Sequence, residues 1–202
     1  MGTLKKTSKD VKWEVLGSKE LLHIDSRMTV SVQKVKLPDG RIIDDYCRVI
    51  FPDCVIIAAV TKGKKVVMSR QYLHGFGHAS IVLPAGTMNK GEEPLQAAKR
   101  ELLEETGYDS DDWTPLASPY SHTNYVGGKV NFFLARNARK LAEPDSKDLE
   151  EMETLLLNEA SIIKNIKRGN IISMGSITGL TLAKLHFNAP CIRGMRRNTG
   201  PV

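Results

Sequence analysis

Residues 86–108 read GTMNKGEEPLQAAKRELLEETGY, and this stretch decides the fold. Pro94 predicts the first turn of a helix, where the N–H group that proline lacks would have no partner anyway. Gly107 predicts the end of that helix, which we expect over residues 93–106. Glu101, Glu104 and Glu105 are then three and four positions apart, so their carboxylates converge on one side of the helix.

Two interpretations of this acidic helix compete. It could be a solvated face with Lys99 and Arg100 as partners, which is the common case for charged helices. It could also hold a divalent cation, because carboxylate oxygens suit Mg²⁺ or Mn²⁺ and no nearby His or Cys favours zinc. An apolar stripe of Leu95, Ala98 and Leu102 is expected to press the helix against a sheet.

The same stretch resembles the Nudix box, G-x5-E-x7-R-E-U-x-E-E-x-G-U, in which U is a bulky apolar residue. The matching positions are Gly86, Glu92, Arg100, Glu101, Leu102, Glu104, Glu105 and Gly107, with Tyr108 a common variant at the last position. A pattern of this length in a strand–loop–helix context is a specific signal. The resemblance implies a hydrolase that cleaves phosphoanhydride bonds with Mg²⁺, or alternatively Mn²⁺.

The resemblance also implies roles for individual residues. Glu101 and Glu105 would bind metal, with the carbonyl of Ala85 as a further ligand. Glu104 is the next candidate ligand. Arg100 would pair with Glu92 and orient a metal-binding glutamate. Gly86 is expected to permit a tight turn. These assignments make residues 85–105 the expected catalytic and metal site.

Most of the chain, roughly residues 13–185, resembles the branch of ADP-ribose and nucleotide-sugar pyrophosphatases. That similarity implies a small-molecule nucleotide substrate, a homodimer built with the N-terminal strands, and a general base in an acidic loop, for which Glu150 is the first choice and Glu151 the second. Trp13 would stack on a base and Arg48 would contact phosphate. Two other interpretations are equally good: Trp13 is a hydrophobic anchor in the β-domain, and Arg48 is a surface residue of a strand. Members of this branch commonly have Arg, Glu and Gly where this chain has Leu73, Val82 and Tyr120. These departures leave the identity of the substrate open.

The expected fold class is α/β: a mixed β-sheet sandwiched between helices (α/β/α), with a small N-terminal antiparallel β subdomain. We expect a β-rich extension over residues 1–51, a Nudix domain over 52–187 and a flexible basic tail over 188–202. The strands are expected at 13–24, 28–37, 41–51, 54–60, 65–70, 81–83, 130–135 and 154–157, and the later helices at 160–168 and 173–185. The apolar run CVIIAAV (54–60) predicts a strand buried on both faces.

Composition narrows the partners and the compartment. The formal net charge of +6 comes from scattered lysines and arginines, so we expect attraction of anionic small molecules and no nucleic-acid binding. No apolar run is long enough to cross a membrane, and no membrane partner is expected. The three cysteines, Cys47, Cys54 and Cys191, form no C-x-x-C pair, which favours a reducing cytoplasm.

Three other functions remain open at this point. A Nudix hydrolase of (d)NTPs or dinucleotides would have the same box, but the N-terminal β extension disfavours a minimal triphosphatase. A non-catalytic nucleotide-sensing module usually has an eroded box, whereas this one is intact. A nucleic-acid-binding protein would need a basic strip interleaved with aromatic residues, which the sequence lacks.

Overall fold

The computed structural model describes residues 12–145 and 152–188 of the 202-residue chain. It contains two compact units. The first unit comprises the chain up to Asp53 together with Pro119–Lys129, and the second comprises Cys54–Ser118 and the chain from Val130 onward.

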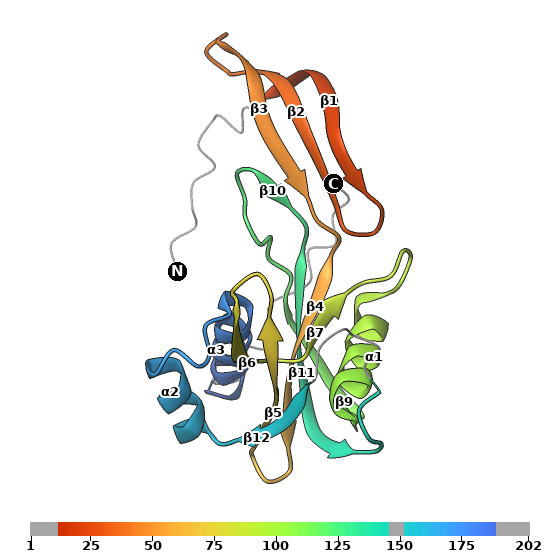
Figure 1. Ribbon diagram of the computed structural model, residues 1–202, viewed down its shortest axis with the longest axis vertical. Helices are drawn as coiled ribbons and strands as arrows, with labels where there is room; N and C mark the ends of the chain where they lie inside the picture. Colours follow the sequence, from red (N-terminus) through yellow and green to blue (C-terminus); the bar gives the residue numbers. More distant parts are fainter. Residues whose placement is uncertain (1–11, 146–151, 189–202) are drawn as a thin grey trace. The chain divides into compact units, whose positions relative to one another are not determined.

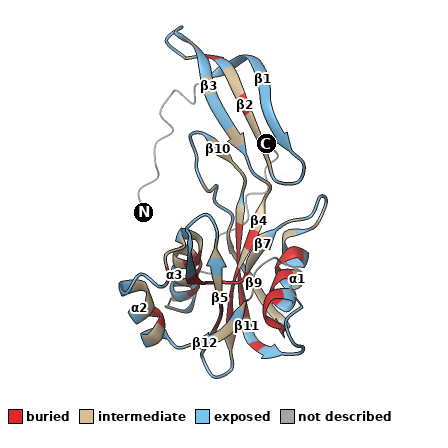
Figure 2. Cartoon of the chain, viewed as in Figure 1, coloured by how far each residue is buried: buried red, intermediate tan, exposed pale blue. Residues whose placement is uncertain are grey.

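The first unit is a four-stranded sheet in the order β1-β2-β3-β10 (Figure 1). β1 (Glu14–Ile24), β2 (Met28–Lys36) and β3 (Ile42–Ile50) pair antiparallel, and β10 (Val126–Gly127) pairs parallel with β3. The turn between β2 and β3 uses Gly40 at φ 88°, a backbone conformation that glycine adopts without the steric cost that a side chain brings. Every residue of β1 is exposed, as its pale blue colour in Figure 2 shows.

The second unit is built on an eight-stranded mixed sheet with the central order β12-β5-β4-β11-β8. β4 and β11 run parallel, β5 is antiparallel to β4 and to β12, and β6, β7 and β9 join at the edges of β5, β4 and β11. The strand bounds are β4 Cys54–Thr61, β5 Val66–Leu73, β6 His78–Val82, β7 Ala85–Thr87, β8 Tyr108–Asp109, β9 Asp112–Ala117, β11 Val130–Lys140 and β12 Glu153–Leu157.

Helices cover both faces of this sheet, α1 (Pro94–Thr106) on one side and α2 (Glu159–Lys167) and α3 (Met174–Asn188) on the other (Figure 1). β4 supplies both cores, because neighbouring residues in a strand point to opposite faces. Val55 and Ile57 pack in the core under α1, whereas Ala58 packs in the core under α2 and α3. The expected burial of this strand on both faces and the expected α/β/α class are therefore confirmed.

The expected elements are found, with differences at their ends. β11 extends to Lys140, five residues beyond the expected end at 135, and α3 continues to Asn188. Four short strands, β7, β8, β9 and β10, were not expected from the sequence. No helix within residues 12–145 and 152–188 is long and apolar enough to cross a membrane.

Candidate active site

The box helix α1 has the signals that the sequence predicts. Pro94 is its first residue, and Gly107 ends it in the left-handed conformation at φ 71°, where its N–H donates to the carbonyl of Leu103 at 2.8 Å. A Cβ at Gly107 would lie 2.0 Å from the carbonyl oxygen of Ala142. Glycine is therefore required there both by the backbone conformation and by the close approach of a neighbouring segment.

The buried side of α1 differs from the expected stripe at one position. Ala98 and Leu102 are fully buried, but Leu95 is 40% exposed and Ala97 is buried in its place. Glu101 and Glu105 share the buried side with these apolar residues, at 8% and 5% exposure. Two carboxylates are thus held in the interface between the helix and the sheet, where a charged group costs free energy unless it is compensated.

Strand β7 meets these two carboxylates. The backbone N–H of Ala85 donates to Glu105 Oε2 at 3.2 Å. A Cβ at Gly86 would lie 2.0 Å from Glu101 Cδ, so only glycine lets that carboxylate lie against the strand. The expected tight turn at Gly86 is wrong: the residue lies inside β7, opposite Val55 of β4, and its role in the structure is to leave space.

Arg100 is the centre of an ion-pair network. Its Nε and Nη2 donate to the two oxygens of Glu92 at 2.9 and 3.0 Å, a paired arrangement that suits the planar guanidinium. Nη1 donates to Glu101 Oε1 at 2.7 Å and to Glu104 Oε2 at 3.2 Å. One cation therefore contacts three of the four box glutamates.

Backbone groups that the sequence analysis did not identify complete this network. The carbonyl of Thr87 accepts from Arg100 Nη2 at 3.2 Å, and the N–H of Asn89 donates to Glu92 Oε2 at 2.8 Å. Hydrogen bonding to Arg100 lowers the pKa of Glu92 below its usual range, and hydrogen bonding to Glu92 raises the pKa of Arg100. Both groups are therefore charged at neutral pH, and the pair fixes the loop before α1 to the helix.

The donor chemistry fits a hard divalent cation. Among the residues that the structure describes, no three His, Cys, Asp or Glu side chains form a ready-made metal cluster. Magnesium sites do not need one, because Mg²⁺ is usually held by one or two carboxylates, with water and substrate phosphates as its other ligands. Glu101 and Glu105, side by side against β7, provide such a pair of carboxylates.

The structure brings Ala85, Arg100, Glu101, Glu104 and Glu105 together in the second unit. The two expected substrate contacts lie in the first unit. Trp13 is 49% exposed and packs edge-on against Tyr46 with 5.5 Å between ring centroids, and Arg48 is an exposed residue of β3. The expected general base Glu150 and its alternative Glu151 lie outside the described residues.

The fold and the site together define an α/β protein whose acidic helix is suited to divalent-cation chemistry. The NUDIX domain family matches residues 51–173, and the chain belongs to that family as a Nudix hydrolase. The ADP-ribose pyrophosphatase of Bacillus subtilis (strain 168) is 31% identical over 150 residues, which cover 74% of this chain and 80% of the relative.

Two further comparisons agree with this family. The methanol dehydrogenase activator of Bacillus methanolicus is 30% identical over 162 residues, covering 77% of this chain and 84% of that protein. A solved structure of an ADP compounds hydrolase superimposes with a TM-score of 0.77 at 20% identity, covering 87% of this chain and 94% of that one. The structural match supports the fold, and the Nudix ADP-ribose pyrophosphatases generally use a divalent metal ion.

Proposed function

We propose that the protein cleaves the diphosphate of a nucleoside diphosphate derivative, ADP-ribose or a nucleotide sugar, to a nucleoside monophosphate and a sugar phosphate. The observation that carries the proposal is the intact box geometry, with Glu101 against Gly86, Glu105 bonded to Ala85 and Arg100 joined to Glu92. The similarity to the ADP-ribose pyrophosphatase of Bacillus subtilis supports the substrate class.

The metal proposed for the site is Mg²⁺, with Mn²⁺ as the alternative. Glu101 and Glu105 would hold it, with the carbonyl of Ala85 as a further ligand and Glu104 close to them. Such a cation neutralises charge on a diphosphate and lowers the pKa of a bound water. Arg100 has a positioning role in this proposal: its 2.7 Å bond to Glu101 fixes one carboxylate oxygen, and its bonds to Glu92 fix Arg100 itself.

The reaction consumes one water. Its oxygen bonds to one phosphorus of the diphosphate, and the bridging oxygen leaves with the other phosphate. A general base must accept a proton from the water, and Glu150 is proposed for this step, with Glu151 as the alternative. Both belong to the acidic segment that precedes β12 in the chain.

Trp13 and Arg48 are proposed to contact the substrate beyond the diphosphate. An indole can stack on a base and a guanidinium can pair with phosphate oxygens. The exposure of both side chains within the first unit is consistent with such contacts.

A homodimer and a cytoplasmic location are further parts of the proposal. The homodimer is proposed from the exposed strand β1, and the cytoplasmic location from the cysteine pattern.

A substrate competition tests the proposed function. We expect kcat/KM with Mg²⁺ to be higher for ADP-ribose or GDP-mannose than for any (d)NTP, with a nucleoside monophosphate and a sugar phosphate as products. The Glu105→Gln variant is the control that measures hydrolysis by contaminating phosphatases. A clear preference for a triphosphate or a dinucleotide would refute the substrate class, and no hydrolysis across the panel would refute the proposed activity.

A further inference from the structure

A cavity of about 580 Å³ lies in the second unit between α2, α3 and the sheet. Its wall is mainly apolar and is formed by residues of β4, β5, β11, α2 and α3 and of the turn between β4 and β5. Its apolar lining residues include Val60, Val66, Ile162, Ile166, Ile177 and Leu180. Binding sites for small organic molecules commonly have volumes of about 300–1,000 Å³ and apolar walls, so this cavity has the size and character of a ligand site.

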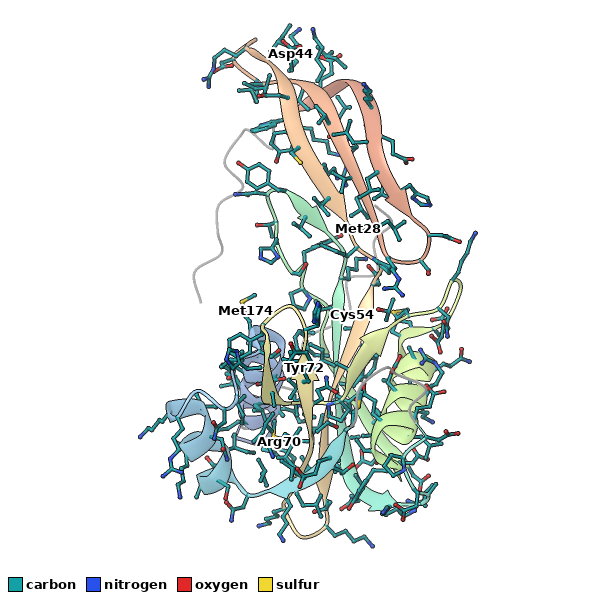
Figure 3. The ribbon with its side chains drawn as sticks, in the orientation of Figure 1. Met28, Asp44, Cys54, Arg70, Tyr72 and Met174 are labelled. Atoms are coloured by element: carbon teal, nitrogen blue, oxygen red, sulfur yellow. The ribbon has the colours of Figure 1, made fainter. Side chains whose placement is uncertain are left out.

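The cavity is separate from the box. It lies on the face of the sheet that α2 and α3 cover, whereas α1 covers the opposite face (Figure 1). Met174, labelled in Figure 3, marks the start of α3 on this side of the sheet. The cavity is lined by Thr61, the last residue of β4, whereas β7 pairs with the first residues of β4. No residue of the box lines it, so its occupant need not be the substrate of the hydrolase.

Four basic residues line the cavity as well, and two of them already have carboxylate partners. Arg136 donates to the two oxygens of Asp112 at 3.0 and 3.2 Å, and Lys184 pairs with Glu159. The other two, Lys62 and Lys64, lie in the turn between β4 and β5 and form no ion pair with a described residue. The rim therefore has positive charge that its own carboxylates do not balance.

We propose that this cavity binds a small amphiphilic carboxylate, with its hydrocarbon chain between α2 and α3 and its carboxylate beside Lys62 and Lys64. The apolar wall matches the chain, and the unbalanced cations match the head group. Charge disfavours the chain's own C-terminal segment as the occupant, because residues 189–202 contain three arginines and no acidic residue. An anionic molecule from outside the chain is the better complement.

Calorimetry of the full-length protein with octanoate, decanoate and dodecanoate tests the proposal. We expect one site per chain and an affinity that increases about fourfold for each added methylene, as burial of hydrocarbon predicts. Decanol, which has the chain without the charge, should bind more weakly than decanoate. Glu105→Gln should bind decanoate like the wild type, so the result does not depend on the proposed hydrolase activity.

Matched variants locate the site. Lys62→Ala with Lys64→Ala should weaken decanoate binding about fivefold to tenfold, the effect of losing two largely exposed charge contacts. Lys65→Ala is in the same turn but outside the cavity lining, and this variant should leave the affinity for decanoate unchanged. Ala183→Phe should fill the cavity and abolish binding, whereas Leu185→Phe on the same helix should not. If Ala183→Phe fails to fold in a thermal melt, Ile163→Trp at the half-exposed wall replaces it.

Several results would overturn the proposal. The first is that dodecanoate does not bind at concentrations up to about 1 mM, which corresponds to only about 4 kcal/mol of binding free energy. The second is that decanol and decanoate bind equally well. The third is that the Lys65→Ala control loses as much affinity as the variant with both Lys62→Ala and Lys64→Ala. Unchanged binding in a folded cavity-filling variant would place the ligand elsewhere.

Discussion

Gly86 of β7 lies directly against the carboxylate of Glu101, with no room for a Cβ between them. A Gly86→Ala side chain would lie 2.0 Å from Glu101 Cδ and must displace this carboxylate from the position that Arg100 fixes. We expect kcat to fall by at least about tenfold, the effect of disturbing a group that orients a metal ligand. Steady-state kinetics with a Mg²⁺ titration measure this. Gly75→Ala is the control, because a Cβ there meets nothing within 4 Å.

Arg100→Lys keeps the positive charge and removes the planar set of donors. Lysine cannot bond both oxygens of Glu92 while also reaching Glu101 and Thr87, so the network loses several charge-assisted bonds. We expect a loss of about 1–3 kcal/mol in the free energy of unfolding and a lower kcat. Urea unfolding and kinetics measure the two effects. Arg139→Lys, at an exposed pair with Asp111, should change neither, and wild-type stability of Arg100→Lys would contradict the network's role.

The pair of Glu92 and Arg100 also predicts a pH dependence. Because the folded protein lowers the pKa of Glu92, this carboxylate contributes stability above its unfolded pKa of about 4.3, and that contribution is lost as pH falls through the lower folded value. Glu92→Gln should therefore have a lower Tm than the wild type at pH 7. The difference should narrow as the pH falls below about 4.3. A Tm difference that stays constant from pH 7 to pH 3 would contradict this assignment.

Local signals explain which parts of the fold the sequence predicts well. Pro94 and Gly107 fix the ends of α1, and the turn at Gly40 fixes the register of β2 and β3, because each signal acts on its own few residues. Helical spacing also places Glu101 and Glu105 on one side of α1. The pair of Glu92 and Arg100 is expected instead from the resemblance to the Nudix box.

Long-range pairing explains the parts that the sequence does not predict. β10 has only two residues, and its strand conformation comes from pairing with Val49 and Ile50, more than seventy positions earlier in the chain. β7 is a strand because Val55 and Ile56 lie beside it. Leu95 satisfies the apolar pattern of α1 but lies in its first turn and is 40% exposed. The cavity between α2 and α3 depends on tertiary packing and has no local sequence signal.

Glu105→Gln tests the metal site directly. The amide keeps the size of the side chain and can still accept from the N–H of Ala85, so the fold and Tm should hold. One carboxylate fewer weakens cation binding and the activation of water together, and we expect kcat to fall by roughly a hundredfold or more. Glu93→Gln, exposed at the start of the same helix, is the matched control. Turnover close to wild type at saturating Mg²⁺ would refute Glu105 as a ligand.

The exposed strand β1 predicts the oligomeric state of the protein. Among the described residues, this strand is at the edge of its sheet and pairs only with β2. It exposes five large apolar side chains, Val15, Leu16, Leu21, Leu22 and Ile24. An exposed apolar edge strand favours pairing with another chain, so we expect a homodimer with twice the 22.4 kDa mass of the chain in light scattering at micromolar concentration. Leu21→Glu together with Leu22→Glu should give a folded monomer, because two charges on β1 oppose its burial. Leu141→Glu, equally exposed in the second unit, should remain dimeric. A wild-type protein that is monomeric under these conditions would refute the dimer, and a double variant that stays dimeric would place the interface away from β1.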